Sequence, residues 1–202
     1  QVVAGEQATN GVSAATGGLA GVETLSAGDT TACAVANSEV LCWGNNEFGQ
    51  LGDGKSEEQP TSNVPVRTLG VGGTGFLTGI ESVAAGASST CAIRDQNAQV
   101  LCWGDNEFGQ LANDQAPGTE LRSDVPVESL DPTGQQPLVG MDGVSVGQIG
   151  ACGNTAQGGV LCWGSNTVGE VGSGLLPSQL EDALLPMPVA GPNGAGLLGG
   201  IG

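Results

Sequence analysis

One phrase occurs three times in this chain of 202 residues, and it constrains the fold more than any other feature. The phrase reads LCWGNNEFGQLG at residues 41–52, LCWGDNEFGQLA at residues 101–112 and LCWGSNTVGEVG at residues 161–172. A second phrase precedes it each time, as GVETLSAG at 21–28, GIESVAAG at 79–86 and GMDGVSVG at 140–147. A third phrase, VPV or MPV, follows at 64–66, 125–127 and 187–189. A period of about 60 residues kept this regularly predicts one supersecondary unit that stacks on copies of itself.

The six cysteines follow the same period, with one pair in each repeat. The pairs are Cys33 with Cys42, Cys91 with Cys102, and Cys152 with Cys162. Each pair flanks a short polar turn and is bordered by β-prone residues, which predicts a hairpin. In the first repeat, a turn at residues 37–38 places Val35 opposite Val40 and Cys33 opposite Cys42. Residues that face each other in a non-hydrogen-bonded pair are close enough for a disulfide, so we expect one bridge within each repeat.

Zinc binding and redox catalysis are the competing interpretations of these cysteines. Zinc sites use closely spaced cysteines or histidine partners, and redox centres use Cys-x-x-Cys. The sequence has neither spacing and contains no histidine. Three disulfides indicate an oxidising compartment, so the expected location is extracellular or at the cell surface.

The charge balance excludes several partners. Four Lys and Arg residues stand against 21 Asp and Glu residues, which gives a net charge of -17. Such a surface repels the phosphates of nucleic acids and of anionic membranes, so neither is an expected partner. No stretch of 18 apolar residues occurs, so we expect no membrane insertion.

Taken together, the phrases resemble the repeat of the regulator-of-chromosome-condensation family, which builds β-propellers. The resemblance rests on V-x-x-G, T-C-A, C-W-G-x-N-x-x-G-Q-L-G and P-V, and covers about residues 21–202. It implies an all-β fold of four-stranded antiparallel blades, arranged as a partial propeller or an open array. The phase of the pattern gives repeat 1 at 21–78, repeat 2 at 79–139 and repeat 3 at 140–199. Residues 1–20 would then be the tail of a preceding repeat and a loop, and residues 200–202 the start of a further repeat.

Four strands are expected in each repeat. The innermost are 22–27, 80–85 and 141–146; the second are 31–36, 90–94 and 150–154; the third are 39–43, 99–103 and 160–163; the outermost are 64–69, 125–130 and 187–190. The outermost strand contains a proline, which cannot donate to a ladder and therefore belongs at an edge.

Three kinds of side chain are candidate site residues. Trp43, Trp103 and Trp163 are expected to fill the core between blades, with stacking on a base or sugar as the alternative. Asn46, Asn106 and Asn166 are expected to bond turns rather than ligands. Several loop carboxylates offer a weak possibility of Ca²⁺ binding without the EF-hand spacing, and no other cofactor is expected. These are Asp53, Glu57, Glu58, Asp114, Glu120 and Asp124.

The sequence predicts a protein without enzymatic activity. It has no histidine base for a Ser-His or Cys-His pair and no phosphate-binding loop. The favoured hypothesis is an extracellular structural or adhesive protein that assembles through its blade ends. Its partners would be further repeats of the same polypeptide or other copies, in a closed ring or an open filament. The alternative is a binding module of a larger surface protein whose loops recognise a protein or glycan ligand. The nucleotide-exchange role of eukaryotic relatives is disfavoured by the acidity and the disulfides.

Overall fold

The computed structural model describes residues 18–115 and 121–199. These residues form three separate four-stranded antiparallel sheets, which confirms the all-β expectation. The first sheet contains β1 (Val22–Ala27), β2 (Thr31–Ala36), β3 (Glu39–Asn45) and β4 (Thr61–Arg67). The second contains β5 (Ile80–Ala85), β6 (Ser89–Arg94), β7 (Gln99–Asp105) and β8 (Arg122–Glu128). The third contains β9 (Met141–Val146), β10 (Gly150–Thr155), β11 (Val160–Ser165) and β12 (Asp182–Pro188).

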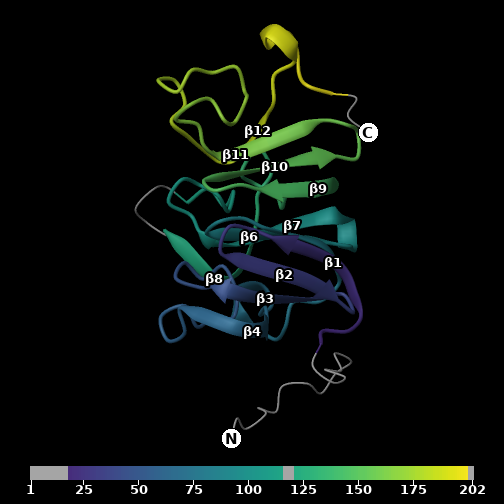
Figure 1. Ribbon diagram of the computed structural model, residues 1–202. Helices are drawn as coiled ribbons and strands as arrows, with labels where there is room; N and C mark the ends of the chain where they lie inside the picture. Colours follow the sequence, from purple (N-terminus) through teal and green to yellow (C-terminus); the bar gives the residue numbers. More distant parts are fainter. Residues whose placement is uncertain (1–17, 116–120, 200–202) are drawn as a thin grey trace, which may run out of the picture.

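The three sheets, which we call blades 1, 2 and 3, follow one another through the molecule (Figure 1). Within each blade the strands lie in sequence order, as in β1-β2-β3-β4. Neighbouring blades meet mainly through their inner strands, because β5 lies against β1 and β2, and β9 lies against β5 and β6. The sheets do not close into a ring, so the described residues form a partial propeller. Most of the expected tail of a preceding repeat, residues 1–17, and the expected onset of a further repeat at 200–202 lie outside the described residues.

Two short 3-10 segments lie between strands, η2 (Val71–Gly73) and η3 (Gln96–Ala98), and a third, η4 (Pro192–Gly194), follows β12. Within the described ranges, no helix has the length and apolar character needed to cross a membrane.

The turn of the first hairpin has the predicted position and register. Asn37 and Ser38 both have positive φ, 52° and 60°. Two successive left-handed residues match the twist of the flanking strands and set the register of a hairpin. Val35 is paired with Val40 and Cys33 with Cys42, as the sequence predicts.

The predicted limits of the outermost strands were wrong. These strands begin earlier than expected, at Thr61, Arg122 and Asp182, and end at Arg67, Glu128 and Pro188. In blade 1, Cys42 is paired with Val66 and Gly44 with Ser62, so residues 63–65 face one residue of β3. This is a bulge, and Pro65, which has no N–H to donate, lies in it. The strand therefore continues through the proline instead of starting there.

The hydrophobic core lies between blades. One buried cluster joins blades 1 and 2, and its members are Cys33, Val35, Val40, Cys42, Leu51, Leu77, Ile80, Val83, Ala85, Ala92, Leu101 and Trp103. A second joins blades 2 and 3, and its members are Cys91, Ile93, Val100, Cys102, Leu111, Ala112, Leu138, Met141, Ala151 and Trp163. Each blade thus buries its apolar residues on its neighbour, as in other stacked repeats.

Candidate functional site

Each blade has two unlike faces. The disulfide face carries the cysteine pair and points to the following blade, whereas the tryptophan face points to the preceding one. In the first cluster, Cys33 and Cys42 of blade 1 pack with Leu101 and Trp103 of blade 2. The second cluster repeats this pairing one blade further on. A blade-to-blade contact therefore always joins a disulfide face to a tryptophan face.

The tryptophans of blades 2 and 3 bond to the preceding blade. The Nε1–H of Trp103 donates to the carbonyl oxygen of Gln50 at 2.9 Å, and that of Trp163 to Gln110 at 2.8 Å. Their side chains are 0% and 1% exposed, so they offer no surface on which a base or sugar could stack. Trp43, at the same place in blade 1, is only partly buried. An indole needs a hydrogen-bond acceptor when it is buried, and the neighbouring blade supplies it.

All six cysteines are bridged, in the three pairs expected within the repeats. The Cα atoms of each pair are 4.0–4.1 Å apart, as in directly opposed residues. The bridges of blades 1 and 2 are 0% exposed beneath the following blade. In blade 3, Cys162 is 5% exposed and Cys152 is partly buried. The third bridge is thus more open to solvent than its two counterparts.

The inner strands approach so closely that side chains are excluded at one level. A Cβ built on Gly28 would lie 2.0 Å from the carbonyl oxygen of Gly86, and one on Gly86 would lie 2.4 Å from that of Gly147. Next to this contact, the N–H of Ala85 donates to the Ser26 hydroxyl at 3.0 Å. The glycine that directly follows the innermost strand, Gly28 in blade 1 and Gly86 in blade 2, therefore allows the close approach of the next blade.

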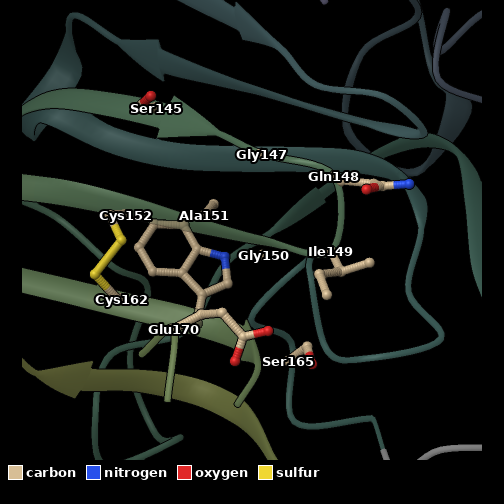
Figure 2. Close-up of a pocket in the computed structure, with 11 residues that line it drawn as sticks. Ser145, Gly147, Gln148, Ile149, Gly150, Ala151, Cys152, Cys162, Ser165 and Glu170 are labelled. Atoms are coloured by element: carbon tan, nitrogen blue, oxygen red, sulfur yellow. A yellow bond between two sulfur atoms is a disulfide. The ribbon is translucent and has the colours of Figure 1, made fainter. Parts of the chain in front are cut away.

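The disulfide face of blade 3 is hollowed into a cavity of about 280 Å³. Figure 2 shows the bridge at one side of it, Ile149 and Ser165 at the other, and Glu170 between them. Ser145 also lines the cavity and is paired with Cys152, as Ser26 is paired with Cys33 in blade 1. On blades 1 and 2 the corresponding face is covered by the next blade, so this cavity lies where a further blade would pack.

The asparagine of each long loop holds the loop in shape. Its Oδ1 accepts the backbone N–H five residues later: Leu51 to Asn46 at 3.1 Å, Leu111 to Asn106 at 3.0 Å and Val171 to Asn166 at 3.3 Å. The turn-bonding interpretation of these residues is therefore confirmed.

The loop carboxylates considered for Ca²⁺ are engaged in different ways. Asp53 is 8% exposed and accepts from the side chain of Asn46 at 3.0 Å and the N–H of Lys55 at 3.2 Å. Glu57 forms an ion pair with Arg122 at 3.1 Å. Residues 18–115 and 121–199 contain no group of three or more acidic, Cys or His side chains placed to hold a metal ion. Glu120 lies outside these ranges, and Ca²⁺ binding stays a prediction.

A second group of carboxylates gathers where the long loop of blade 2 meets β12. Burial raises the pKa of Asp182 above its ordinary value of 3.8, and the charges of Glu181, Glu170 and Glu107 raise it further. For Glu170, burial also pulls the pKa upward. Hydrogen bonds from the Val168 N–H and the Thr167 hydroxyl outweigh it, so the pKa of Glu170 is lowered. This group of carboxylates carries a strong negative charge at neutral pH.

Family comparisons match the regulator of chromosome condensation (RCC1) repeat. One model matches residues 37–93, and a second model of the same repeat matches residues 22–50 and 80–110. Ultraviolet-B receptor UVR8 of Arabidopsis thaliana is 30% identical over 172 residues, which are 82% of this chain and 33% of UVR8. The chain belongs to the RCC1-repeat family. E3 ubiquitin-protein ligase HERC2 of Homo sapiens is 31% identical over 110 residues, 53% of this chain and 2% of HERC2.

Solved structures show the same RCC1-type architecture. Human WBSCR16 superposes with a TM-score of 0.64 at 20% identity, over 82% of this chain and 37% of that one. Prp20p from Saccharomyces cerevisiae superposes with a TM-score of 0.65 at 19% identity, over 86% of this chain and 39% of Prp20p. This likeness establishes the RCC1 propeller fold. The chain spans about a third of UVR8 and a small fraction of HERC2.

Proposed function

We propose that this chain is a non-enzymatic, extracellular structural protein that assembles through its blade faces. The outward disulfide face of blade 3 receives the tryptophan face of another RCC1-type blade. That blade belongs either to a further repeat of the same polypeptide or to another copy of the chain.

The observation that carries this proposal is the cavity beside Cys152 and Cys162. Its rim repeats the positions that bind the next blade elsewhere. Ser145 stands where Ser26 accepts a backbone N–H, and Glu170 stands where Gln50 and Gln110 offer their carbonyl oxygens. The tryptophan face of blade 1 also has exposed apolar side chains, since Val22 is 44% and Leu25 is 66% exposed. Exposed apolar faces of this kind favour association with another protein surface.

Two further features support an extracellular and non-catalytic role. The three bridges favour an oxidising compartment, because cytosolic thiols are kept reduced. The chain has no histidine, and every cysteine is bridged, so the usual nucleophile–base pairs are not available to it. A role in binding proteins has a precedent in the fold, since Prp20p is described with binding to Gsp1p and histones.

Sedimentation of the purified chain tests the proposal. We expect species heavier than one chain, whose proportion rises with protein concentration. Ser145→Arg would place a long charged side chain in the cavity and should abolish these species without unfolding the protein, because Ser145 is exposed. Ser178→Arg adds the same charge to an exposed loop of blade 3 and is the matched control. A native parent chain in which further blades cover the cavity would be monomeric and would still support the proposal. A monomeric chain whose cavity stays open to solvent would refute it.

A further inference from the structure

At the outer side of the propeller, the long loop of each blade packs on the outermost strand of the next. A Cβ built on Gly49 of blade 1 would lie 2.5 Å from Cα of Asp124 in β8, and one on Gly109 of blade 2 would lie 3.0 Å from Cα of Leu184 in β12. These two contacts define a first and a second junction. At the first, Arg122 bridges the blades: its Nη1 donates to the carbonyl oxygen of Glu47 at 3.1 Å and its Nη2 to Glu57 at 3.1 Å.

Asp182 occupies the position of Arg122 at the second junction. Arg122 is the first residue of β8 and is paired with Asp105, whereas Asp182 is the first residue of β12 and is paired with Ser165. The chain therefore has an acidic side chain where the preceding junction has a guanidinium.

No positive charge compensates Asp182 among the groups that act on its carboxylate. The charged groups that influence it are Glu181 beside it, Glu170 in the loop of its own blade and Glu107 in the loop of blade 2. Its Oδ1 is buried and has no hydrogen-bond partner in the described parts of the chain. A buried carboxylate oxygen without a donor is costly and gains from any cation that reaches it.

Exposed or partly exposed apolar residues lie close to two of these carboxylates in the sequence. Val168, two residues from Glu170, is 82% exposed, and Phe108, next to Glu107, is partly exposed. We name this surface the acidic junction. It consists of Glu107, Phe108, Val168, Glu170, Glu181 and Asp182.

We propose that the acidic junction binds an arginine-bearing segment of a partner protein. An arginine of the partner bonds to the Asp182 carboxylate at the second junction, where it takes the bridging role that Arg122 has at the first. An adjacent apolar residue of the partner covers Val168. Arginine fits better than lysine because its planar fork can donate at once to a carboxylate and to a loop carbonyl, as Arg122 does. The surface lies beside a contact between two blades of this chain, and it shares Glu170 with the cavity on the disulfide face of blade 3.

A protein segment fits this surface better than a metal ion. The described residues have no group of three or more acidic, Cys or His side chains placed to hold a metal, and a bare cation would gain nothing from Val168 or Phe108. Net charge complementarity points the same way, since a chain of charge -17 attracts basic partners.

Fluorescence anisotropy with a short peptide of alternating Arg and Leu tests the proposal at physiological ionic strength. We expect saturable binding to the native chain, about tenfold weaker for Asp182→Asn, in line with the loss of one charge-assisted hydrogen bond. Asp182→Arg supplies the missing guanidinium from within and should leave no measurable binding. Asp142→Asn removes the same charge from an exposed site on β9 of the same blade, and its affinity should stay within about twofold of the native one. Melting curves check that each variant is folded.

Four results would overturn the proposal. The first is no binding of the arginine peptide to the native chain. The second is an equal loss in Asp182→Asn and Asp142→Asn, which would mean diffuse attraction by net charge. The third is equal affinity for a peptide in which Lys replaces Arg, which would mean that the planar guanidinium is not needed for binding. The fourth is calorimetric binding of Ca²⁺ alone that Asp182→Asn abolishes, which would make the junction a metal site. Asp182 does not line the cavity, so Asp182→Asn should leave self-association unchanged, and this proposal and the assembly proposal can fail separately.

Discussion

At the scale of single residues, the same residue of the repeat has different surroundings in different blades. Trp103 and Trp163 are sealed between blades and donate to a carbonyl of the preceding blade, whereas Trp43 is only partly buried. The energetic weight of each tryptophan therefore depends on whether a blade lies over it.

Truncation of the tryptophans should reveal this difference. Trp103→Ala should lower the free energy of unfolding by about 3–5 kcal/mol, because it leaves a cavity in the core and removes one of the two donors to the Gln50 carbonyl oxygen, the other being the Thr90 hydroxyl. Trp43→Ala should cost clearly less, since part of its surface is already in water. Chemical denaturation of both variants makes the comparison. Equal losses would contradict this placement of the two side chains.

A second residue-scale prediction concerns pH. The folded-state pKa of Asp182 is raised, chiefly by burial and then by Glu181, Glu170 and Glu107. The folded protein therefore holds this proton more tightly than the unfolded chain, and the contribution of Asp182 to stability is largest below the ordinary pKa of 3.8. It is lost as pH rises from 3.8 through the raised value. Melting temperatures across this acidic window should show that Asp182→Asn has a smaller loss on raising the pH than the native chain, while Asp142→Asn behaves like the native chain.

At the scale of strands and blades, short sequence patterns predicted the features that depend on neighbouring residues alone. The hairpin between β2 and β3 follows from a turn pair and two opposed cysteines, all within ten residues, and its register was predicted correctly. The start of β4 was not, because the bulge at residues 63–65 depends on how the strand meets β3 across a long loop.

The candidate sites were predictable only in part, for a related reason. The acceptor of Trp103 and that of Trp163 are backbone carbonyls 53 residues away, which no local pattern shows. An alignment of the repeats shows that Asp182 stands at the position of Arg122. The consequence of this change depends on the loop of the preceding blade, whose position only the structure gives.

The disulfides give a prediction at this scale. A thiolate must reach the sulfur along its line of attack, so a covered bridge resists exchange while the fold persists. Under native conditions with rising dithiothreitol, the bridge between Cys152 and Cys162 should be reduced first, since Cys33, Cys42, Cys91 and Cys102 are each 0% exposed. Alkylation and peptide mass mapping would identify the reduced pair. In denaturant the three bridges should be reduced at similar rates, because no blade covers them. If the same bridge were still reduced first, the order of reduction would depend on local sequence and not on coverage by the next blade.

At the scale of the whole molecule, charge and apolar burial oppose each other. Copies that dock blade on blade each bring a net charge of -17, so their approach is resisted by a repulsion that salt screens. The contact itself is largely apolar on the model of the two internal interfaces, and salt does not weaken such burial. Self-association should therefore strengthen as sodium chloride rises. An arginine peptide at the acidic junction is held by attraction between opposite charges, so its affinity should fall over the same range. Sedimentation and anisotropy on one preparation would follow both trends together. Association that weakened with salt would point to contacts between charged groups, and would contradict docking through the open disulfide face of blade 3.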